Sequence, residues 1–250
     1  MKIVLKLLKN YNPLEAVSGS RAVSSFSVRA SGNMSLSYGQ TSRALENRKS
    51  FLSSLNIDYQ DLICAKQVHG SKVKYVNEAD QGSGAFAYDT AIPDTDGFIT
   101  DIRNLPLGIL TADCLSIFLY DSQRPAVGLI HAGWRSSKEN IVSRAIELMH
   151  NKFETNPAEL FAGFGPTIKN CCYEVSGEFK HNFATGLTRR QGRVYLDLAA
   201  VNKKQLNGLG VKEKNIFDSE FCTHCEAQDF FSFRREGKIS GRVLSVIMLK

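Results

Sequence analysis

Residues 105–134 read LPLGILTADCLSIFLYDSQRPAVGLIHAGW and contain three apolar runs separated by short polar breaks. Short apolar runs bounded by turn residues predict buried β-strands. We therefore expect two strands within residues 105–121 and a third, buried strand within 126–134. Cys114 precedes the second run and His131 ends the third. A buried cysteine alone is common in protein cores, but a soft metal ligand on each of two neighbouring runs is less common.

Apolar runs elsewhere predict the remaining strands. Residues 62–76 read as two strands around a turn at His69 and Gly70. The stretch MKIVLKLLKN, residues 1–10, reads as a first strand, because Lys6 interrupts the apolar core that a signal peptide needs. Further strands are expected over residues 96–101, 159–168 and 241–250.

Two helices are expected between these strands. The first follows Trp134, with Ser136 and Glu139 at capping-box spacing and apolar residues at helical spacing over 141–149. The second covers residues 197–210 and ends at glycine. Because strands and helices are mixed and several strands are hairpin neighbours, the predicted fold class is α+β: a single-domain α/β sandwich with a mixed sheet over residues 1–250. Residues 77–97 are expected to form a functional or mobile loop within that domain.

The composition excludes several classes of protein. The chain has 250 residues, of which 43% are hydrophobic and 22% charged, and no apolar run approaches the roughly 20 residues of a membrane span. The formal net charge is +6, but the basic residues are scattered, whereas nucleic-acid binders more often carry a basic stripe. We therefore expect a cytoplasmic protein without membrane or nucleic-acid partners, whose six cysteines stay reduced.

His69, Cys114 and His131 each lie at the end of an apolar run or in a turn, where a scaffold can bring distant residues together. Two histidines and one cysteine are a ligand set that zinc accepts while it keeps a fourth position for water, as in catalytic sites. Their separations match no short metal motif, so a core cysteine with two turn histidines is the plainer interpretation. A third interpretation makes Cys114 a thiolate nucleophile with a histidine as its base.

Five motifs occur in order along the chain: QVHG, TADCLSIFLYD, IHAGWR, GPTIKNCCYEV and FFSFRREGKISGR. Together they resemble the YfiH-like family of laccase-domain proteins, from about Asn33 to residue 250. The resemblance implies a CNF1/YfiH-like α/β domain with a zinc ion held by His69, Cys114 and His131. It also implies phosphorolysis of adenosine, inosine and methylthioadenosine, and deamination of adenosine.

Three further residues are expected to bind substrate or phosphate. Arg135 follows HAGW and precedes a predicted helix, where a guanidinium and free N–H groups would bind phosphate. Arg48 lies on a predicted helix, whose solvated face is the alternative, but the resemblance places an Asn-Arg pair near the pocket. Asp113 adjoins the cysteine and would orient a ligand or pair with an arginine. Of Arg234 and Arg235, one is expected to pair with an acid.

Three positions depart from the family pattern. Ser116 stands where proline is usual, Ser136 where glycine is usual, and Phe233 where tyrosine is usual. None of them is an implied zinc ligand. The change at Phe233 removes a hydroxyl near the expected substrate pocket.

The segment FCTHC, residues 221–225, contains a Cys-x-x-Cys pair. A closed structural zinc site needs a second ligand pair, and the adjacent Cys171 and Cys172 would point to opposite faces of a strand. We therefore expect a turn with a buried cysteine here and no second zinc. A multicopper oxidase needs about ten histidines for its copper cluster, but the chain has five and no His-x-His pair, so a true laccase is excluded.

The sequence thus predicts a zinc enzyme that acts on purine nucleosides and phosphate, as a monomer or weak homo-oligomer. One alternative is a cysteine hydrolase or amidase acting on a peptidoglycan precursor, with Cys114 as nucleophile. The other is a non-catalytic binding module. Stoichiometric zinc separates the first two functions, and adenosine turnover that depends on Cys114 excludes the third.

Overall fold

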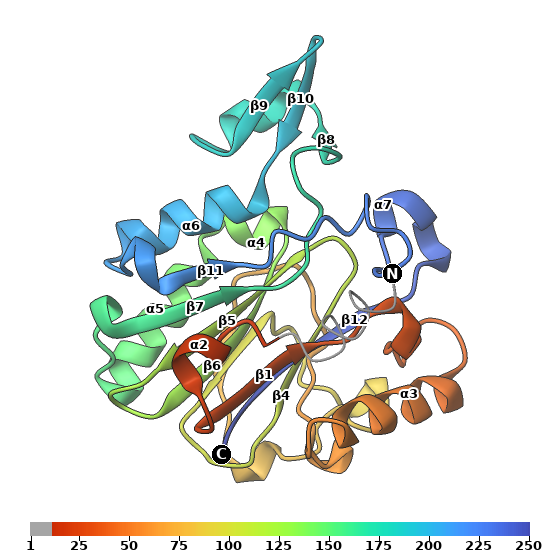
Figure 1. The fold of residues 1–250 in the computed structure, drawn as a ribbon, viewed down its shortest axis with the longest axis vertical. Coiled ribbons are helices and arrows are strands. Elements are labelled where there is room, and N and C mark those ends of the chain that lie inside the picture. Colours follow the sequence, from red (N-terminus) through yellow and green to blue (C-terminus); the bar gives the residue numbers. More distant parts are fainter. Residues whose placement is uncertain (1–11) are drawn as a thin grey trace.

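The computed structural model describes residues 12–250, so the strand expected over residues 1–10 lies outside the described range. A six-stranded mixed sheet runs through the middle of the molecule, in the order β11-β7-β5-β6-β3-β2 (Figure 1). The β11–β7 and β2–β3 pairs are parallel, and the other pairs are antiparallel. Its strands are β11 (Ile216–Asp218), β7 (Leu160–Phe164), β5 (Leu115–Asp121), β6 (Ala126–Ala132), β3 (Gly97–Thr100) and β2 (Val73–Tyr75).

A second, antiparallel sheet packs against one face of this central sheet. It consists of β1 (Ala22–Phe26), β12 (Val243–Leu249) and β4 (Leu107–Thr111), with β12 in the middle. Helices α5 (Ile141–Phe153) and α6 (Leu198–Gly208) cover the opposite face, and α3 (Thr41–Ser53) covers the outer face of the second sheet. The layers are therefore helix, sheet, sheet and helix, and the expected sandwich with a mixed sheet is confirmed.

Alternation along β5 explains why this strand lies between two cores. Leu115, Ile117 and Leu119 pack with α5 and α6, whereas Phe118 and Tyr120 pack with the second sheet. All seven residues of β5 are buried, as expected for a strand covered on both faces.

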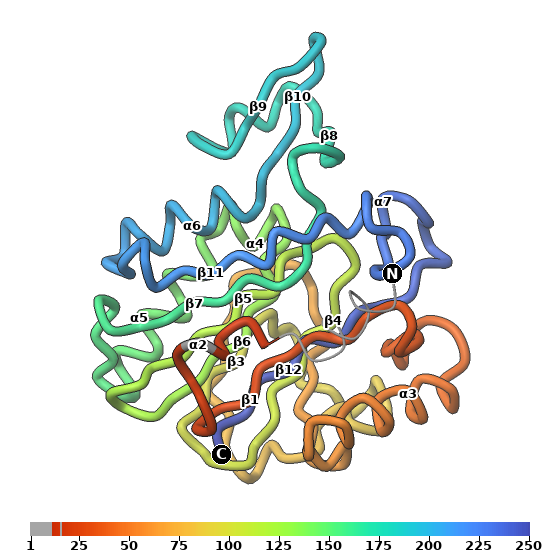
Figure 2. Tube along the Cα trace, viewed as in Figure 1, coloured from red at the N-terminus to blue at the C-terminus, as the bar shows by residue number. Residues whose placement is uncertain are grey.

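A small third sheet stands apart from these layers at the top of Figure 1. It consists of β8 (Glu174–Val175), β10 (Arg193–Leu196) and β9 (Leu187–Arg190), in that order. The chain passes directly from β10 into α6 (Figure 2), where the Asp197 side chain accepts a hydrogen bond from the Ala200 N–H and caps the helix. Three short helices complete the fold: α2 (Glu15–Ser18), α4 (Trp134–Lys138) and α7 (Phe233–Glu236).

The expected strands over residues 96–101, 105–121, 126–134, 159–168 and 241–250 are confirmed, although their ends shift by a few residues. The region 62–76 differs, because only β2 is a strand there, and Ile63 and Ala65 form isolated bridges. The helix after Trp134 begins earlier than expected: Ser136 lies inside α4, and its hydroxyl accepts a hydrogen bond from the Gly133 N–H. None of the helices in residues 12–250 has both the length and the apolar character of a membrane span.

Candidate metal centre and substrate pocket

The register of β5 and β6 brings Cys114 beside His131. These strands are antiparallel, with Leu115 opposite Ala132 and Ser116 opposite His131. Cys114 immediately precedes β5, so it lies next to the end of β6. The preceding residue, Asp113, has φ of 88°, which turns the chain sharply between β4 and β5.

Asp96 connects the third residue, His69, to this strand end. Its carboxylate accepts hydrogen bonds from the backbone N–H groups of Val68, His69 and Gly70, over 3.1, 2.9 and 2.9 Å. The same carboxylate lies 2.8 Å from His131 Nδ1. Asp96 directly precedes β3, which pairs with β6. One buried carboxylate therefore fixes both histidines.

The ligand atoms of His69, Cys114 and His131 lie within 4.8 Å of one another. His69 is exposed, Cys114 half-buried and His131 buried, so the group faces solvent on one side. The His69 and His131 rings meet edge to face, with centroids 4.7 Å apart. Because an ionised Asp96 only accepts hydrogen bonds, Nδ1 of His131 carries its hydrogen and Nε2 is left for a metal. The arrangement matches a three-ligand metal site.

The electrostatics of the group favour a thiolate. Burial opposes ionisation of Cys114, but His131 and His69 outweigh burial and lower the pKa of the thiol to about 6. Burial would likewise lower the pKa of His131, yet the Cys114 sulfur and the Asp96 carboxylate raise it to about 9. Burial also opposes ionisation of Asp96, but hydrogen bonds from His131 and the backbone keep its pKa below the usual range. Cys114 and His131 thus each favour the charged form of the other.

Gly133 permits this close approach. A Cβ atom at this position would lie 3.0 Å from His69 Cδ2 and 3.1 Å from Cys114 Sγ. Both distances are shorter than ordinary van der Waals contacts, so a side chain here would push the two ligands apart. The glycine of the HAGW motif is thus explained by its position between two candidate ligands.

His69, Cys114 and His131, together called the metal group, lie in a pocket of about 790 Å³. Tyr38, Tyr88 and Phe233 line it, although they are 49%, 42% and 49% exposed. Trp134 and Tyr173 add two further rings. Aromatic faces that remain exposed within a pocket are suited to stacking against a planar ligand.

Three arginines line the same pocket: Arg135, Arg234 and Arg242. Arg234 donates to the Glu174 carbonyl at 2.8 Å, and Arg242 donates to the Ser240 and Gly241 carbonyls. The Arg135 guanidinium stacks on the Trp134 ring at 4.2 Å and donates no hydrogen bond to the part of the chain that the structure describes. Arg135 is exposed, and it is the one of the three that follows the His131 strand end in the sequence.

Arg48 is not brought to this pocket, contrary to expectation. It is 1% exposed, so it lies on neither a solvated helix face nor the pocket wall. Its guanidinium donates to the carbonyls of Met34, Gly84 and Ala85 at 2.8, 2.9 and 3.1 Å. Arg48 therefore anchors α3 to two loops, since three backbone acceptors take its donors.

Asp113 lines the pocket, but both of its oxygens are already bonded. Oδ1 accepts from the Thr223 hydroxyl at 2.6 Å, and Oδ2 accepts from the Arg234 backbone N–H at 2.6 Å. The carboxylate thus positions the Cys114 turn. Arg235 forms the ion pair expected of one member of the Arg234–Arg235 pair, at 2.6 Å from Glu236.

Two of the departures from the family pattern make hydrogen bonds of their own. Ser116 is fully buried and accepts from the Ser245 hydroxyl at 2.8 Å, which links the two large sheets. Ser136 accepts from Gly133 at the start of α4. The third, Phe233, lies on the pocket wall. The pocket wall therefore lacks the hydroxyl that a tyrosine at this position would carry.

Sequence reasoning missed Asp96, Gln67 and most of the aromatic wall. Gln67 precedes the His69 turn, and its amide pairs with the Leu110 backbone through two hydrogen bonds of 2.8 Å. The signal for Asp96 was its position as the first residue of the strand predicted over 96–101. In the structure it directly precedes β3, as Cys114 directly precedes β5. Only the sheet order shows that these strand ends are adjacent.

Comparison with known proteins places this site in a family. Residues 17–250 match the family model described as "Multi-copper polyphenol oxidoreductase laccase". The purine nucleoside phosphorylase YlmD of Geobacillus stearothermophilus is 33% identical over 228 residues, which cover 87% of this chain and 83% of the relative. The adenosine deaminase RL5 of an unknown prokaryotic organism is 32% identical, covering 83% and 82%.

A solved structure shows the same fold. The Bacillus licheniformis hypothetical protein YfiH superposes with a TM-score of 0.88 at 32% identity, over 92% of this chain and 93% of that chain. The chain therefore belongs to the YfiH-like family, the family of the laccase-described model.

Proposed function

We propose that this chain is a zinc-dependent purine nucleoside enzyme, with residues 1–250 as one catalytic domain. It would phosphorolyse adenosine, inosine and methylthioadenosine to the free base and a ribose 1-phosphate, and deaminate adenosine. The observation that carries the proposal is the convergence of His69, Cys114 and His131 in a pocket lined by aromatic rings and arginines. The names of the YlmD and RL5 relatives support both activities.

The three residues fit zinc by the chemistry of their donors. Thiolate and imidazole are preferred zinc ligands, and three protein ligands are typical of catalytic zinc. Asp96 supplies the carboxylate that such histidines usually require behind them. Zinc bound here would act as a Lewis acid and would activate water at neutral pH. With five histidines and no His-x-His pair, the chain lacks the ligands of a multicopper cluster, whatever the description of its family model.

The pocket walls would hold the nucleoside. Arg242 lies over the Tyr38 and Phe233 rings, and Lys66 lies over the Tyr88 ring. The exposed remainder of these three aromatic side chains would contact the purine, and each base–aromatic contact is worth about 1–3 kcal/mol. In deamination, water would add at C6 and ammonia would leave. In phosphorolysis, a phosphate oxygen would bond to C1′ as the bond from C1′ to N9 breaks, and N9 would take the electron pair and a proton.

Arg135 is the residue we assign to phosphate. Its guanidinium has free donors, and it follows His131 by four positions on the same strand-to-helix segment. Helix α4 has only five residues, and the Gly133 N–H is already bonded to Ser136. The helix N-terminus therefore adds little to the expected phosphate seat, and the charge of Arg135 is its main component.

The alternative function, a cysteine hydrolase or amidase acting on a peptidoglycan precursor, has one specific observation in its favour. The lowered pKa of Cys114 and the nearby His131 also describe a nucleophile and its base. However, Asp96 and a second histidine beside the thiolate fit metal coordination equally well. Loss of one zinc equivalent per chain in Cys114→Ala would favour the zinc enzyme.

A product assay on the purified protein tests the proposal. Adenosine is incubated with and without phosphate, and the products are separated by chromatography. We expect inosine without phosphate. With phosphate we expect adenine and ribose 1-phosphate as well, together with hypoxanthine from phosphorolysis of the inosine. Adenosine that stays unchanged under both conditions, with zinc bound, would contradict the proposal.

A further inference from the structure

A second group of metal-binding side chains lies outside the pocket. The sulfur atoms of Cys171, Cys172, Cys222 and Cys225 all lie within 4.8 Å of one another. The expectation that Cys171 and Cys172 would diverge is wrong, because they lie in a turn rather than in a strand. The N–H groups of Cys172 and Tyr173 both bond to the Lys169 carbonyl, and this tight turn directs both sulfurs toward residues 222–225.

The distances between the sulfurs fit one shared ion. Cys171 Sγ lies 3.4 Å from Cys222 Sγ and 3.6 Å from Cys225 Sγ, and Cys172 Sγ lies 3.3 Å from Cys225 Sγ. A tetrahedral zinc site with bonds of about 2.3 Å requires sulfurs roughly 3.8 Å apart. The four sulfurs need only small movements to reach that arrangement.

The two shortest contacts join Cys171 to Cys222 and Cys172 to Cys225, and a third contact of 3.6 Å joins Cys171 to Cys225 and so links the two pairs. All four cysteines are free thiols, and two separate disulfides would not need that link. The linked contacts are those of four ligands around one centre.

The surroundings supply hydrogen bonds to the cysteine segments. The guanidinium of Arg235, which is paired with Glu236, donates to the Thr223 and His224 carbonyls at 2.8 and 2.7 Å and so ties the Cys-x-x-Cys loop to α7. The backbone N–H groups of Lys169 and Cys225 interact with the Cys222 sulfur. Hydrogen bonds to the sulfur stabilise a metal-bound thiolate.

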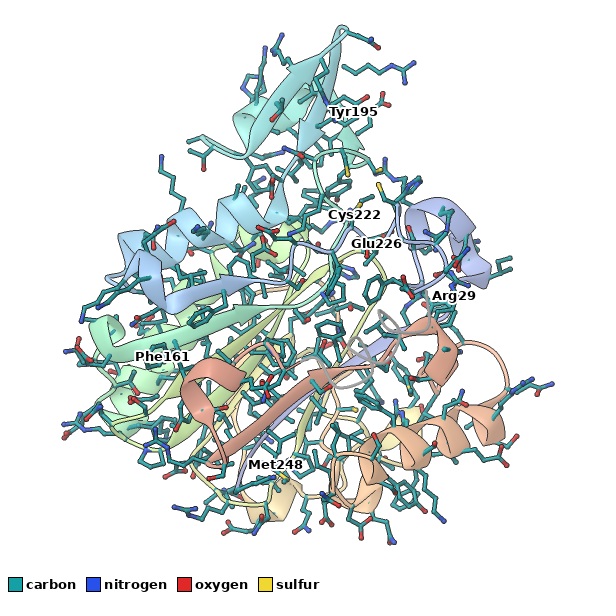
Figure 3. All side chains as sticks on the ribbon, in the orientation of Figure 1. Arg29, Phe161, Tyr195, Cys222, Glu226 and Met248 are labelled. Carbon is teal, nitrogen blue, oxygen red and sulfur yellow. The ribbon has the colours of Figure 1, made fainter. Side chains whose placement is uncertain are left out.

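We propose that Cys171, Cys172, Cys222 and Cys225 bind a structural zinc ion, distinct from the ion of the pocket. With four protein ligands the site is closed, as in structural rather than catalytic zinc sites. It would join two segments that are far apart in the sequence, at the base of the projecting sheet. Figure 3 shows Cys222 there, next to Glu226, whose carboxylate accepts the Cys222 N–H.

This ion would also stabilise one wall of the pocket. Thr223, inside the Cys-x-x-Cys loop, donates to Asp113, the residue before Cys114. Tyr173 directly follows the second cysteine of the turn and lines the pocket. The structural site would thus hold Asp113 and Tyr173 of the pocket in place. It shares no residue with the group of His69, Cys114 and His131.

Metal analysis of matched cysteine variants tests the proposal. Zinc per chain is measured by native mass spectrometry for the wild type, Cys171→Ser, Cys225→Ser, Cys114→Ser and Cys64→Ala, all purified with a thiol reductant. We expect Cys171→Ser and Cys225→Ser each to lose one zinc equivalent that Cys114→Ser retains. Cys64 lies outside both cysteine groups, so Cys64→Ala should keep the wild-type content. Wild-type zinc content in both Cys171→Ser and Cys225→Ser would overturn the proposal.

Alkylation of the wild type keeps the test decisive if these variants do not fold. Cys171 and Cys225 are exposed, so without a metal they should be accessible to iodoacetamide at a pH that ionises their thiols. We expect mass spectrometry of peptides to show both cysteines protected until a chelator removes the zinc. Equal alkylation with and without the chelator would contradict the structural zinc. This outcome says nothing about the pocket, so failure of one proposal is distinguishable from failure of the other.

Discussion

At the scale of single residues, Asp96 organises the metal group although it does not belong to it. It accepts three backbone hydrogen bonds from the His69 turn and one from His131. An amide in its place would turn one of these acceptors into a donor that faces other donors. The geometry of both histidines therefore depends on a carboxylate at this position.

Asp96→Asn should weaken zinc binding in the pocket by about 10–100-fold, the usual cost of losing the carboxylate behind a metal-binding histidine. Competition with a chromogenic chelator measures the affinity. Asp101→Asn is the matched control, because Asp101 is exposed and, within residues 12–250, its carboxylate accepts a hydrogen bond only from the Tyr75 hydroxyl. Equal zinc affinity in Asp96→Asn and the wild type would show that Asp96 does not support a metal site.

Gly133→Ala should disturb the same site by a steric route. The added methyl would lie 3.0 Å from His69 and 3.1 Å from Cys114, and overpacking of this kind typically costs about 1–3 kcal/mol. We expect reduced zinc content and reduced adenosine turnover, with the circular dichroism spectrum unchanged. Gly208→Ala is the control, because a Cβ there meets nothing within 4 Å. Full zinc retention in Gly133→Ala would mean that the two ligands do not converge as described.

At the scale of elements, the short helix α4 follows β6, the strand that carries His131, and its residue Arg135 lines the pocket. Arg135→Ala removes the one basic side chain of α4 that lines the pocket. The loss of such a contact should cost on the order of 2–4 kcal/mol of transition-state stabilisation, so phosphorolysis should fall by at least about a hundredfold. Deamination should fall far less, since no phosphate takes part in it.

Separate measurement of the two rates is the check on Arg135. Arg144→Ala is the control, because Arg144 is an exposed residue of α5 in an ion pair with Glu147. Equal losses of both rates in Arg135→Ala would mean that Arg135 holds the nucleoside or the fold. Unchanged phosphorolysis would place the phosphate on Arg234 or Arg242 instead.

Strands β4, β5 and β6 were predictable because their signal is local. Apolar runs at 107–111, 115–121 and 126–132 are visible in the sequence, and both the runs and the polar breaks between them reappear in the structure. The placement of Cys171 and Cys172 was not predictable, because a strand and a turn direct adjacent side chains differently. The burial of Arg48 was equally hidden, since its three carbonyl partners lie 14, 36 and 37 residues away.

At the scale of the whole molecule, the order of strands assembles the site. His69, Asp96, Cys114 and His131 come from four separate segments, and pairing of β2 with β3, β3 with β6 and β6 with β5 brings them to one edge. The residues alone indicate His69, Cys114 and His131 as candidate ligands but do not show that they lie close together. The family resemblance implies that they share one site, and their ligand atoms do lie within 4.8 Å of one another.

The central claim is that His69, Cys114 and His131 hold a zinc ion on which nucleoside turnover depends. The most direct test measures zinc content and adenosine turnover in the same preparations of the wild type, Cys114→Ala and Cys64→Ala. We predict that Cys114→Ala loses one zinc equivalent relative to the wild type together with its turnover, while Cys64→Ala keeps both. A Cys114→Ala protein that retains its full zinc, or that loses zinc yet consumes adenosine at the wild-type rate, would contradict the claim.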